Sequence, residues 1–134
     1  MAEILDRICD GRGEPQDLDL LEALSGHVRE GSICGLGKTA PNPVETTLRY
    51  FRKEYEAHIY EGRCPTFTCK SLIRYEIDRA NCDGCRACLR ECPVDAITLD
   101  RAIIPLTINP SACIRCDACR EVCPFDAVLA MTGT

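Results

Sequence analysis

The first sixty residues carry apolar side chains at helical spacing. Apolar positions recur every three or four residues in three segments, which predicts a short helix ending before Gly11 and longer helices over about 15–29 and 43–59. Residues 31–43 are rich in glycine and proline and are predicted as a loop, with Asn42 as the N-cap of the third helix. Three helices in this space indicate a small helical unit.

Beyond Arg63 the pattern changes to short apolar runs that alternate with cysteine-rich loops. Three runs have the length and composition of strands: residues 72–77, 96–99 and 103–108. Helices followed by strands predict an α+β chain. We therefore expect a helical domain over residues 1–62, a cysteine-containing junction over 63–73 and a second domain over 74–134.

The twelve cysteines in 134 residues leave two classes of protein, a secreted disulfide scaffold and an intracellular metalloprotein. Residues 1–7 contain acids and lack the apolar core of a signal peptide. We therefore expect a cytoplasmic protein whose reduced, clustered cysteines bind metal. No apolar run is long enough for a membrane span. Acids and bases are interspersed around a net charge of -5, which argues against nucleic-acid binding.

The cysteine-rich part repeats itself with an offset of 31 residues. Residues 82–96 and 113–127 agree at 8 of 15 positions, which include four cysteines, a proline and an Asp-Ala pair. Each repeat reads Cys-x2-Cys-x2-Cys-x3-Cys-Pro. A repeat this short, with possible ligands at matched positions, indicates two half-sites related by approximate twofold symmetry.

This spacing is the bacterial signature of [4Fe–4S] clusters. Three cysteines on one tight loop reach three corners of a cubane, while the fourth, expected to start a helical segment that points away, serves the other cluster. The first cluster is assigned to Cys82, Cys85, Cys88 and Cys123, and the second to Cys113, Cys116, Cys119 and Cys92. Structural zinc, which needs only four ligands, or disulfides are the alternatives.

With these motifs, residues 74–131 resemble a two-cluster bacterial-type ferredoxin. The resemblance implies a ferredoxin-like fold, two [4Fe–4S] clusters and one-electron transfer, with Tyr75 and Phe125 as aromatic candidates to pack near the clusters. Each oxidised cluster with four thiolates carries about -2, so that the loaded chain would carry about -9. That charge favours basic docking partners.

A second resemblance involves Cys34. Residues 32–43 read SICGLGKTAPNP and residues 47–59 read TLRYFRKEYEAHI. They resemble the C-terminal helical region of the NADH-binding flavoprotein subunit of respiratory complex I and of NAD-linked, electron-bifurcating hydrogenases and formate dehydrogenases. The resemblance covers about residues 1–60, and the ferredoxin domain after it matches the hydrogenase type.

The second resemblance implies that Cys34 is the fourth ligand of a further [4Fe–4S] cluster. Its other three ligands would come from a further Cys-x2-Cys-x2-Cys motif, expected just upstream of Met1 and separate from the two runs of the ferredoxin domain. The chain also offers no strand followed by Gly-x-Gly-x-x-Gly. FMN and NAD are therefore expected only in the rest of a longer parent subunit.

Three cysteines remain. Cys64 and Cys69 lie in the junction, close in sequence to His58, and Cys9 follows the first helix, which can pack beside the end of the long helix. Three thiols and one imidazole make a closed tetrahedral zinc set. The alternative is three free cysteines and a solvated histidine at a helix C-terminus. A zinc ion here would fix or swing the ferredoxin domain as a hinge.

The sequence thus predicts an iron–sulfur module that relays single electrons between a flavin- and NADH-linked core and a ferredoxin or hydrogenase-type partner. It holds no complete active site, so that catalysis would belong to a multi-subunit, NAD(P)H-linked oxidoreductase of hydrogenase or NADH dehydrogenase type. Two other functions stay open. One is a free-standing soluble two-cluster ferredoxin with a helical extension, and the other is a zinc-organised scaffold that binds sister subunits.

Overall fold

This computed structural model describes residues 1–100 and 103–133, which divide into two compact units. The first comprises residues 1–72 with Thr132 and Gly133, and the second comprises residues 73–131. The first is helical and the second mixes strands with short helices, so the predicted α+β class is confirmed. Among the described residues, no helix is long and apolar enough to cross a membrane.

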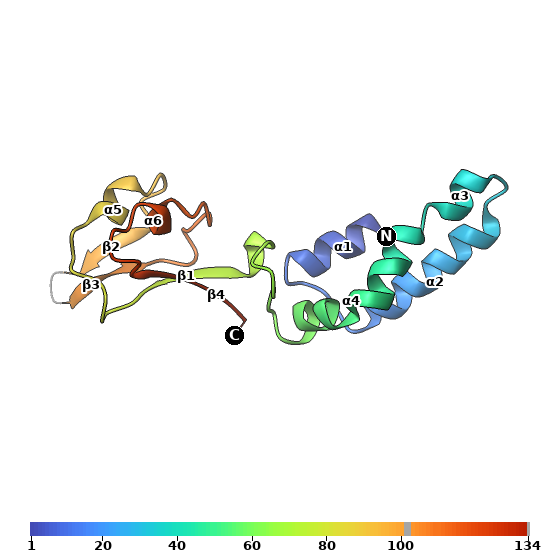
Figure 1. Cartoon of the computed structure of the whole chain (residues 1–134), viewed down its shortest axis with the longest axis horizontal. Coiled ribbons are helices and arrows are strands. Elements are labelled where there is room, and N and C mark those ends of the chain that lie inside the picture. The colour runs from blue at the N-terminus through green and yellow to red at the C-terminus, as the bar shows by residue number, and fades with distance from the viewer. Residues whose placement is uncertain (101–102, 134) are drawn as a thin grey trace. The chain divides into compact units, whose positions relative to one another are not determined.

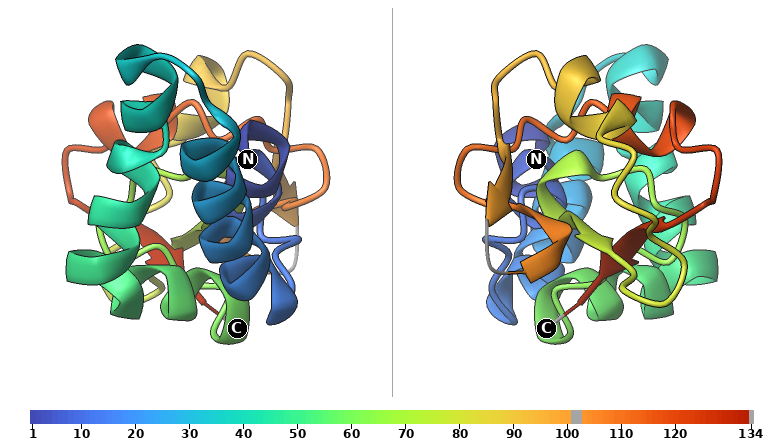
Figure 2. Two further views of the ribbon diagram at one scale, coloured as in Figure 1. Left: turned by 90° about the vertical axis from the view of Figure 1, so that its right-hand side faces the viewer. Right: turned by 90° about the vertical axis from the view of Figure 1, so that its left-hand side faces the viewer.

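The helical unit is built on three apolar helix faces that meet in one core. Its elements are α1 (Ala2–Cys9), α2 (Gln16–Gly31), α3 (Gly35–Thr39), α4 (Asn42–Tyr60) and a 3-10 turn, η1 (Lys70–Leu72) (Figure 1). Helices α2 and α4 lie side by side (Figure 2). The buried core consists of Ile4 and Ile8 from α1, Leu18 and Leu21 from α2, and Leu48 from α4. These positions have the helical spacing read from the sequence.

Two details predicted for this unit are wrong. The loop expected over residues 31–43 contains α3, whose last residue, Thr39, closes the turn by donating its hydroxyl to backbone carbonyls of Gly35 and Leu36. Asn42 is not the N-cap of α4 but lies inside it. Its side-chain oxygen instead accepts a hydrogen bond from Arg29 of α2 at 3.0 Å, so it ties two helices together.

A buried carboxylate, Asp17, joins the first two helices. Its side chain is fully buried and forms an ion pair with Arg7 of α1, and its Oδ2 accepts a 2.8 Å bond from the Glu14 backbone N–H. Burial raises the pKa of Asp17, but the hydrogen bonds from Arg7 and Glu14 and the positive charge of Arg7 outweigh it. The pKa therefore lies below its ordinary value.

Replacing Asp17 with alanine should destabilise the helical unit by about 2 kcal/mol, because Arg7 and the Glu14 N–H lose their buried partner. Because the folded pKa is lowered, this stabilisation is present above the unfolded value of about 3.9 and is lost as the pH falls through the folded value. Urea unfolding followed by circular dichroism of the helices should separate the variant from wild type at pH 7 and bring the two together in acid. Equal stabilities at pH 7 would contradict the assignment.

The second unit contains two pairs of strands and two short helices. Its elements are β1 (Ile73–Ile77), α5 (Ala87–Glu91), β2 (Ile97–Asp100), β3 (Ile103–Ile108), α6 (Ala118–Glu121) and β4 (Val128–Thr132). Strand β1 pairs with β4, and β2 pairs antiparallel with β3, with Ile97 opposite Ile108 and a bulge after Thr98 (Figures 1 and 2). Strand β4 was not among the strands predicted from the sequence.

The 31-residue repeat is visible in the backbone of this unit. Three pairs of positions have positive φ angles at the same offset: Gly84 and Arg115, Arg86 and Asp117, and Asp95 and Asp126. Helices α5 and α6 correspond in the same way. Strands β2 and β4 correspond as well, so the repeat itself carried the missing signal for β4. A left-handed turn at each matched position gives both cysteine loops the same course.

The spacing predicted that the fourth cysteine of each repeat starts a helical segment, and this prediction is wrong. Cys92 follows the end of α5 in an extended conformation, and Cys123 comes two residues after the end of α6. The third cysteine, Cys88 or Cys119, lies inside the helix instead. The helical turn therefore separates the third cysteine from the fourth, which leaves the fourth free to face a different site.

Candidate functional site

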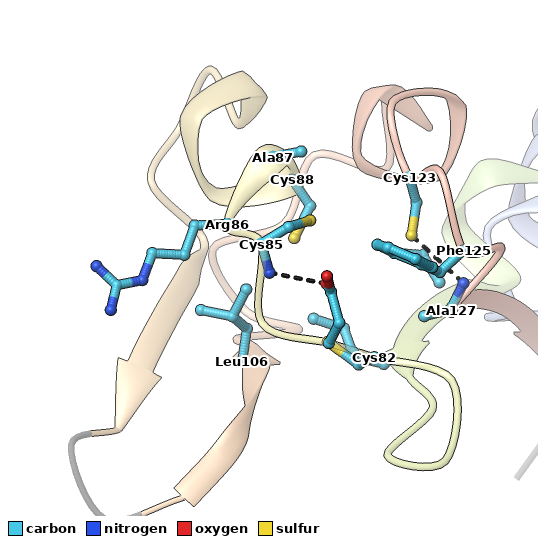
Figure 3. Close-up of a pocket in the computed structure, with 12 residues that line it drawn as sticks. Cys82, Cys85, Arg86, Ala87, Cys88, Leu106, Cys123, Phe125 and Ala127 are labelled. Atoms are coloured by element: carbon cyan, nitrogen blue, oxygen red, sulfur yellow. Dashed lines mark hydrogen bonds between the residues drawn. The ribbon is translucent and has the colours of Figure 1, made fainter.

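A cavity of the second unit is lined by four cysteine sulfurs from both repeats. Cys82, Cys85 and Cys88 come from the loop after β1 and the start of α5, and Cys123 comes from the segment after α6 (Figure 3). Ile77, Leu106 and Phe125 supply apolar lining. These four cysteines are the set assigned to the first cluster from the spacing.

A second cavity repeats this arrangement with the roles of the repeats exchanged. Cys113, Cys116 and Cys119 come from the second repeat, and Cys92 comes from the first. Tyr75 lines this cavity at the position that Leu106 has in the other one. The structure thus brings together both sets of four cysteines predicted from the sequence, each with three cysteines from one repeat and one from the other.

Backbone N–H groups already point at two of these sulfurs. The Ala127 N–H donates to the sulfur of Cys123 at 3.3 Å (Figure 3). The Ala96 N–H donates to the sulfur of Cys92, also at 3.3 Å. The two bonds are equivalent in the repeat. Loops in which successive N–H groups face one point are anion sites suited to iron–sulfur clusters.

The third cysteine of each repeat, Cys88 or Cys119, is the most buried of the four. Burial raises the pKa of the Cys88 thiol, and neighbouring cysteine thiolates add to the effect. Burial likewise raises the pKa of Cys119 to about 11, with the charges of Cys113 and Cys116 as the next causes. Four thiolates so close together repel one another, and a bound cation cluster relieves that repulsion by displacing their protons.

The wall of the second cavity has a polar corner. Burial raises the pKa of Tyr75 to about 12, with a hydrogen bond to Asp117 and its charge as further causes. The Asp117 carboxylate lies 3.1 Å from Arg120 as an ion pair without hydrogen-bond alignment. The neighbouring Arg115 donates to the Ile73 carbonyl at 2.9 Å. This last bond holds the arginine in a left-handed conformation where the first repeat has glycine.

The helical unit holds a separate group of ligand atoms. The possible ligand atoms of His58, Cys64 and Cys69 all lie within 4.8 Å of one another, the single such triad found among the described residues. Cys9 lines the same cavity and approaches Cys69 closely enough to raise its pKa. The structure therefore brings together the four residues predicted as a zinc set. The two sets of four cysteines in the second unit are not among the groups whose ligand atoms lie within 4.8 Å of one another. Wider spacing is expected for sulfurs that surround a cluster rather than a single ion.

The pKa of the Cys64 thiol is lowered, which favours its thiolate form. Burial raises its pKa, but the Thr66 hydroxyl and the backbone N–H groups of Cys69 and Thr68 donate to its sulfur and bring the pKa to about 6. Burial, then the Cys9 and Cys64 thiols, raise the pKa of Cys69 to about 12. One thiolate thus forms readily in the free protein, whereas the next needs a metal ion to compensate it.

The histidine of this group is oriented by its own helix. His58 Nδ1 lies 2.7 Å from the Glu54 backbone carbonyl, and Nε2 lies 3.4 Å from the sulfur of Cys69. A proton on Nδ1 donated to that carbonyl would leave Nε2 as a neutral ligand facing the thiols. The contact of His58 with the Glu54 carbonyl was not predicted from the sequence. The roles of Thr66 and Thr68 beside Cys64 were not predicted either, although the run Cys-Pro-Thr-Phe-Thr-Cys places both threonines between the two cysteines.

Cys34 lies apart from these groups as an exposed residue at the N-cap of α3, where its sulfur accepts the Gly37 N–H at 3.4 Å. A Cβ at Gly37 would come within 2.6 Å of the Ser32 hydroxyl oxygen, so glycine is required for this turn. Ile33 and Leu36 on either side are almost fully exposed. The structure presents this thiol to solvent, outside the triad of ligand atoms found in the described part of the chain.

The fold and the two cysteine-lined cavities define an iron–sulfur protein of the dicluster type, and comparison with known families agrees. Residues 81–127 match the family described as the 4Fe-4S dicluster domain. Residues 1–58 match the NADH-ubiquinone oxidoreductase-F iron-sulfur binding region. The chain therefore contains two iron–sulfur domains and is similar to the F subunit of NADH-quinone oxidoreductase.

Known proteins similar to this chain include a hydrogenase subunit and F subunits of NADH-quinone oxidoreductases. The NADP-reducing hydrogenase subunit HndC of Solidesulfovibrio fructosivorans is 47% identical over 98 residues, which are 73% of this chain and 20% of HndC. The F subunit of the NADH-quinone oxidoreductase of Streptomyces coelicolor is 38% identical over 71 residues, 53% of this chain and 16% of that protein. Its counterpart in Mycobacterium tuberculosis is 40% identical over 65 residues, 48% of this chain and 15% of that protein. The chain spans a fifth or less of these relatives.

Both predicted resemblances are confirmed by these matches, and so is the central functional prediction. The chain is an iron–sulfur electron-transfer module, homologous to HndC and to the F subunits of NADH-quinone oxidoreductases. Its relatives are named as subunits of larger oxidoreductases.

Proposed function

We propose that this module binds two [4Fe–4S] clusters, each held by three cysteines of one repeat and the fourth cysteine of the other. The observation that carries the proposal is the lining of the two cavities, in which the eight cysteines separate into these two sets. Matched N–H donors to Cys92 and Cys123 support it. Exchange of the fourth ligand also ties the repeats together, so that the clusters should stabilise the fold.

The clusters would pass single electrons between a flavin- and NADH-linked core and an external ferredoxin or hydrogenase-type partner, within a multi-subunit oxidoreductase of the cytoplasm. Homology to HndC and to the F subunits supports this placement. Cys34 would be the fourth ligand of a cluster whose other ligands, together with FMN and NAD sites, lie in further parts of such a protein. Its exposed sulfur, framed by exposed Ile33 and Leu36, suits that role.

We further propose that Cys9, His58, Cys64 and Cys69 bind a structural zinc ion. Their closeness supports one ion rather than a cluster, and three thiols with one imidazole are a closed tetrahedral set. Cys9 ends α1, His58 lies near the end of α4, and Cys64 and Cys69 follow α4. The ion would therefore join the two helices to the segment that leads into β1, which is the hinge expected from the sequence.

Electron uptake tests the proposed relay directly. The anaerobically reconstituted chain should take up about two electrons on reductive titration, one for each cluster, and return them on reoxidation. Loss of visible absorbance on reduction, followed against added reductant, measures the number. Bound iron with no reversible electron uptake would refute the relay, and the same chain prepared with zinc in place of iron is the matched control.

A further inference from the structure

The openings of the two cluster cavities differ in chemistry although the repeats are equivalent. Five pairs of lining positions change between them at the offset of 31 residues: Asp83 and Ile114, Arg86 and Asp117, Phe125 and Val94, Leu106 and Tyr75, and the buried pair Val128 and Ile97. The cysteines themselves do not distinguish the openings, because Cys85 and its equivalent Cys116 are both exposed. Any functional difference between the two clusters toward a partner must therefore come from these changed side chains.

The opening of the first cavity carries exposed charges. Asp83 and Arg86 are both exposed, and Asp83 accepts a 2.9 Å hydrogen bond from the Cys85 N–H. The Arg86 side chain points away from the labelled cysteines (Figure 3). Phe125 is 46% exposed beside them. A protein that covered this opening would have to desolvate two exposed charged side chains or supply an opposite charge to each of them.

The opening of the second cavity is apolar instead. Ile114 is 55% exposed and Val94 is 38% exposed, and both line the cavity. Its one charged lining residue, Asp117, is half-buried and ion-paired with Arg120. Cores of protein interfaces are depleted of charged residues, and their apolar centres have polar rims. The opening of the second cavity therefore has the composition of the centre of a protein–protein interface, and it lies over the site proposed for the second cluster.

We infer that electrons leave or enter the module through the second cluster, at a port formed by Val94 and Ile114. The occupant is a redox protein whose cofactor edge is apolar and framed by basic side chains. The apolar edge matches Val94 and Ile114, and the basic frame matches the net charge of -5, which becomes more negative with clusters bound. The inference rests on the proposed two-cluster function.

Cytochrome c is a suitable probe, because it is basic and exposes an apolar haem edge among lysines. In each transfer the cluster loses one electron, the ferric haem iron gains it, and no proton or bond changes. Stopped-flow mixing with the reduced full chain gives the second-order rate. Ile114→Ser and Val94→Ser should each lower that rate about tenfold, while iron content and reduction by dithionite stay unchanged. The exposed Leu129 of β4 provides the control, since Leu129→Ser should change the rate less than twofold.

The competing opening is tested with the equivalent residue. Phe125→Ser removes the apolar side chain of the first opening, and a loss larger than that in Ile114→Ser would overturn the port assignment. Unchanged rates in both Val94→Ser and Ile114→Ser would overturn it too, as would a dimer of this chain that Ile114→Ser disrupts without changing the rate. Failure of the wild type to bind iron would instead refute the two-cluster function, whereas a wild type with about eight irons that does not reduce cytochrome c would overturn the port assignment alone.

Discussion

Replacing Cys123 with serine is expected to remove the cluster bound by Cys82, Cys85 and Cys88, although Cys123 belongs to the other repeat. Iron should fall from about eight to about four per chain, because one cubane loses its fourth thiolate while the other keeps all its ligands. Cys82→Ser should lower the iron content equally. Iron and acid-labile sulfide, measured after anaerobic reconstitution, give both numbers.

Pairs of these substitutions distinguish crossed ligation from ligation within one repeat. Cys82→Ser with Cys123→Ser removes two ligands of the same cluster, so that about four irons should remain. Cys82→Ser with Cys92→Ser removes one ligand from each cluster and should leave almost none. If the four cysteines of one repeat bound one cluster, the two outcomes would be exchanged. Each double variant is the matched control for the other.

Replacing Cys64 with serine is expected to remove the zinc ion of the helical unit. Zinc content should fall from about one per chain to nearly zero, because the hydroxyl cannot supply the thiolate that Thr66, Thr68 and Cys69 stabilise in the wild type. The segment after α4 should then be cleaved faster by proteases, since its attachment to α1 is lost. Elemental analysis after removal of loosely bound metal measures the zinc.

Cys34→Ser is the control for this experiment. Cys34 belongs to the same unit but is exposed and lies outside the triad of ligand atoms, so its replacement should leave the zinc content at the wild-type value. Unchanged zinc in Cys64→Ser would contradict the proposed set. A wild-type chain that binds no zinc would contradict it as well.

The sequence predicted the elements that repeat or recur with a regular period. Helices α1, α2 and α4 follow from apolar spacing, and the grouping of the eight cysteines follows from the Cys-x2-Cys-x2-Cys-x3-Cys run. Periodicity could not predict α3, because a five-residue helix with two glycines has no apolar face of its own. Its turn depends on hydrogen bonds of Cys34 and Thr39.

The details of the sites depended on contacts across the chain. Arg115 has a left-handed conformation because its side chain reaches the carbonyl of Ile73, 42 positions earlier, and no local pattern carries that information. Asp17 reads as an ordinary acid near a helix start, yet it is buried against Arg7. The different openings of the two cluster cavities, in contrast, were readable in advance by extending the 31-residue offset beyond the cysteines.

Electron paramagnetic resonance of the fully reduced chain tests the central claim most directly. Two [4Fe–4S] clusters in one small unit should give a signal that integrates to about two spins per chain and is broadened by interaction between them. Cys123→Ser should simplify it to the signal of a single isolated cluster. A wild-type signal of one isolated cluster, or none at all with zinc in the cysteine sites, would contradict the account.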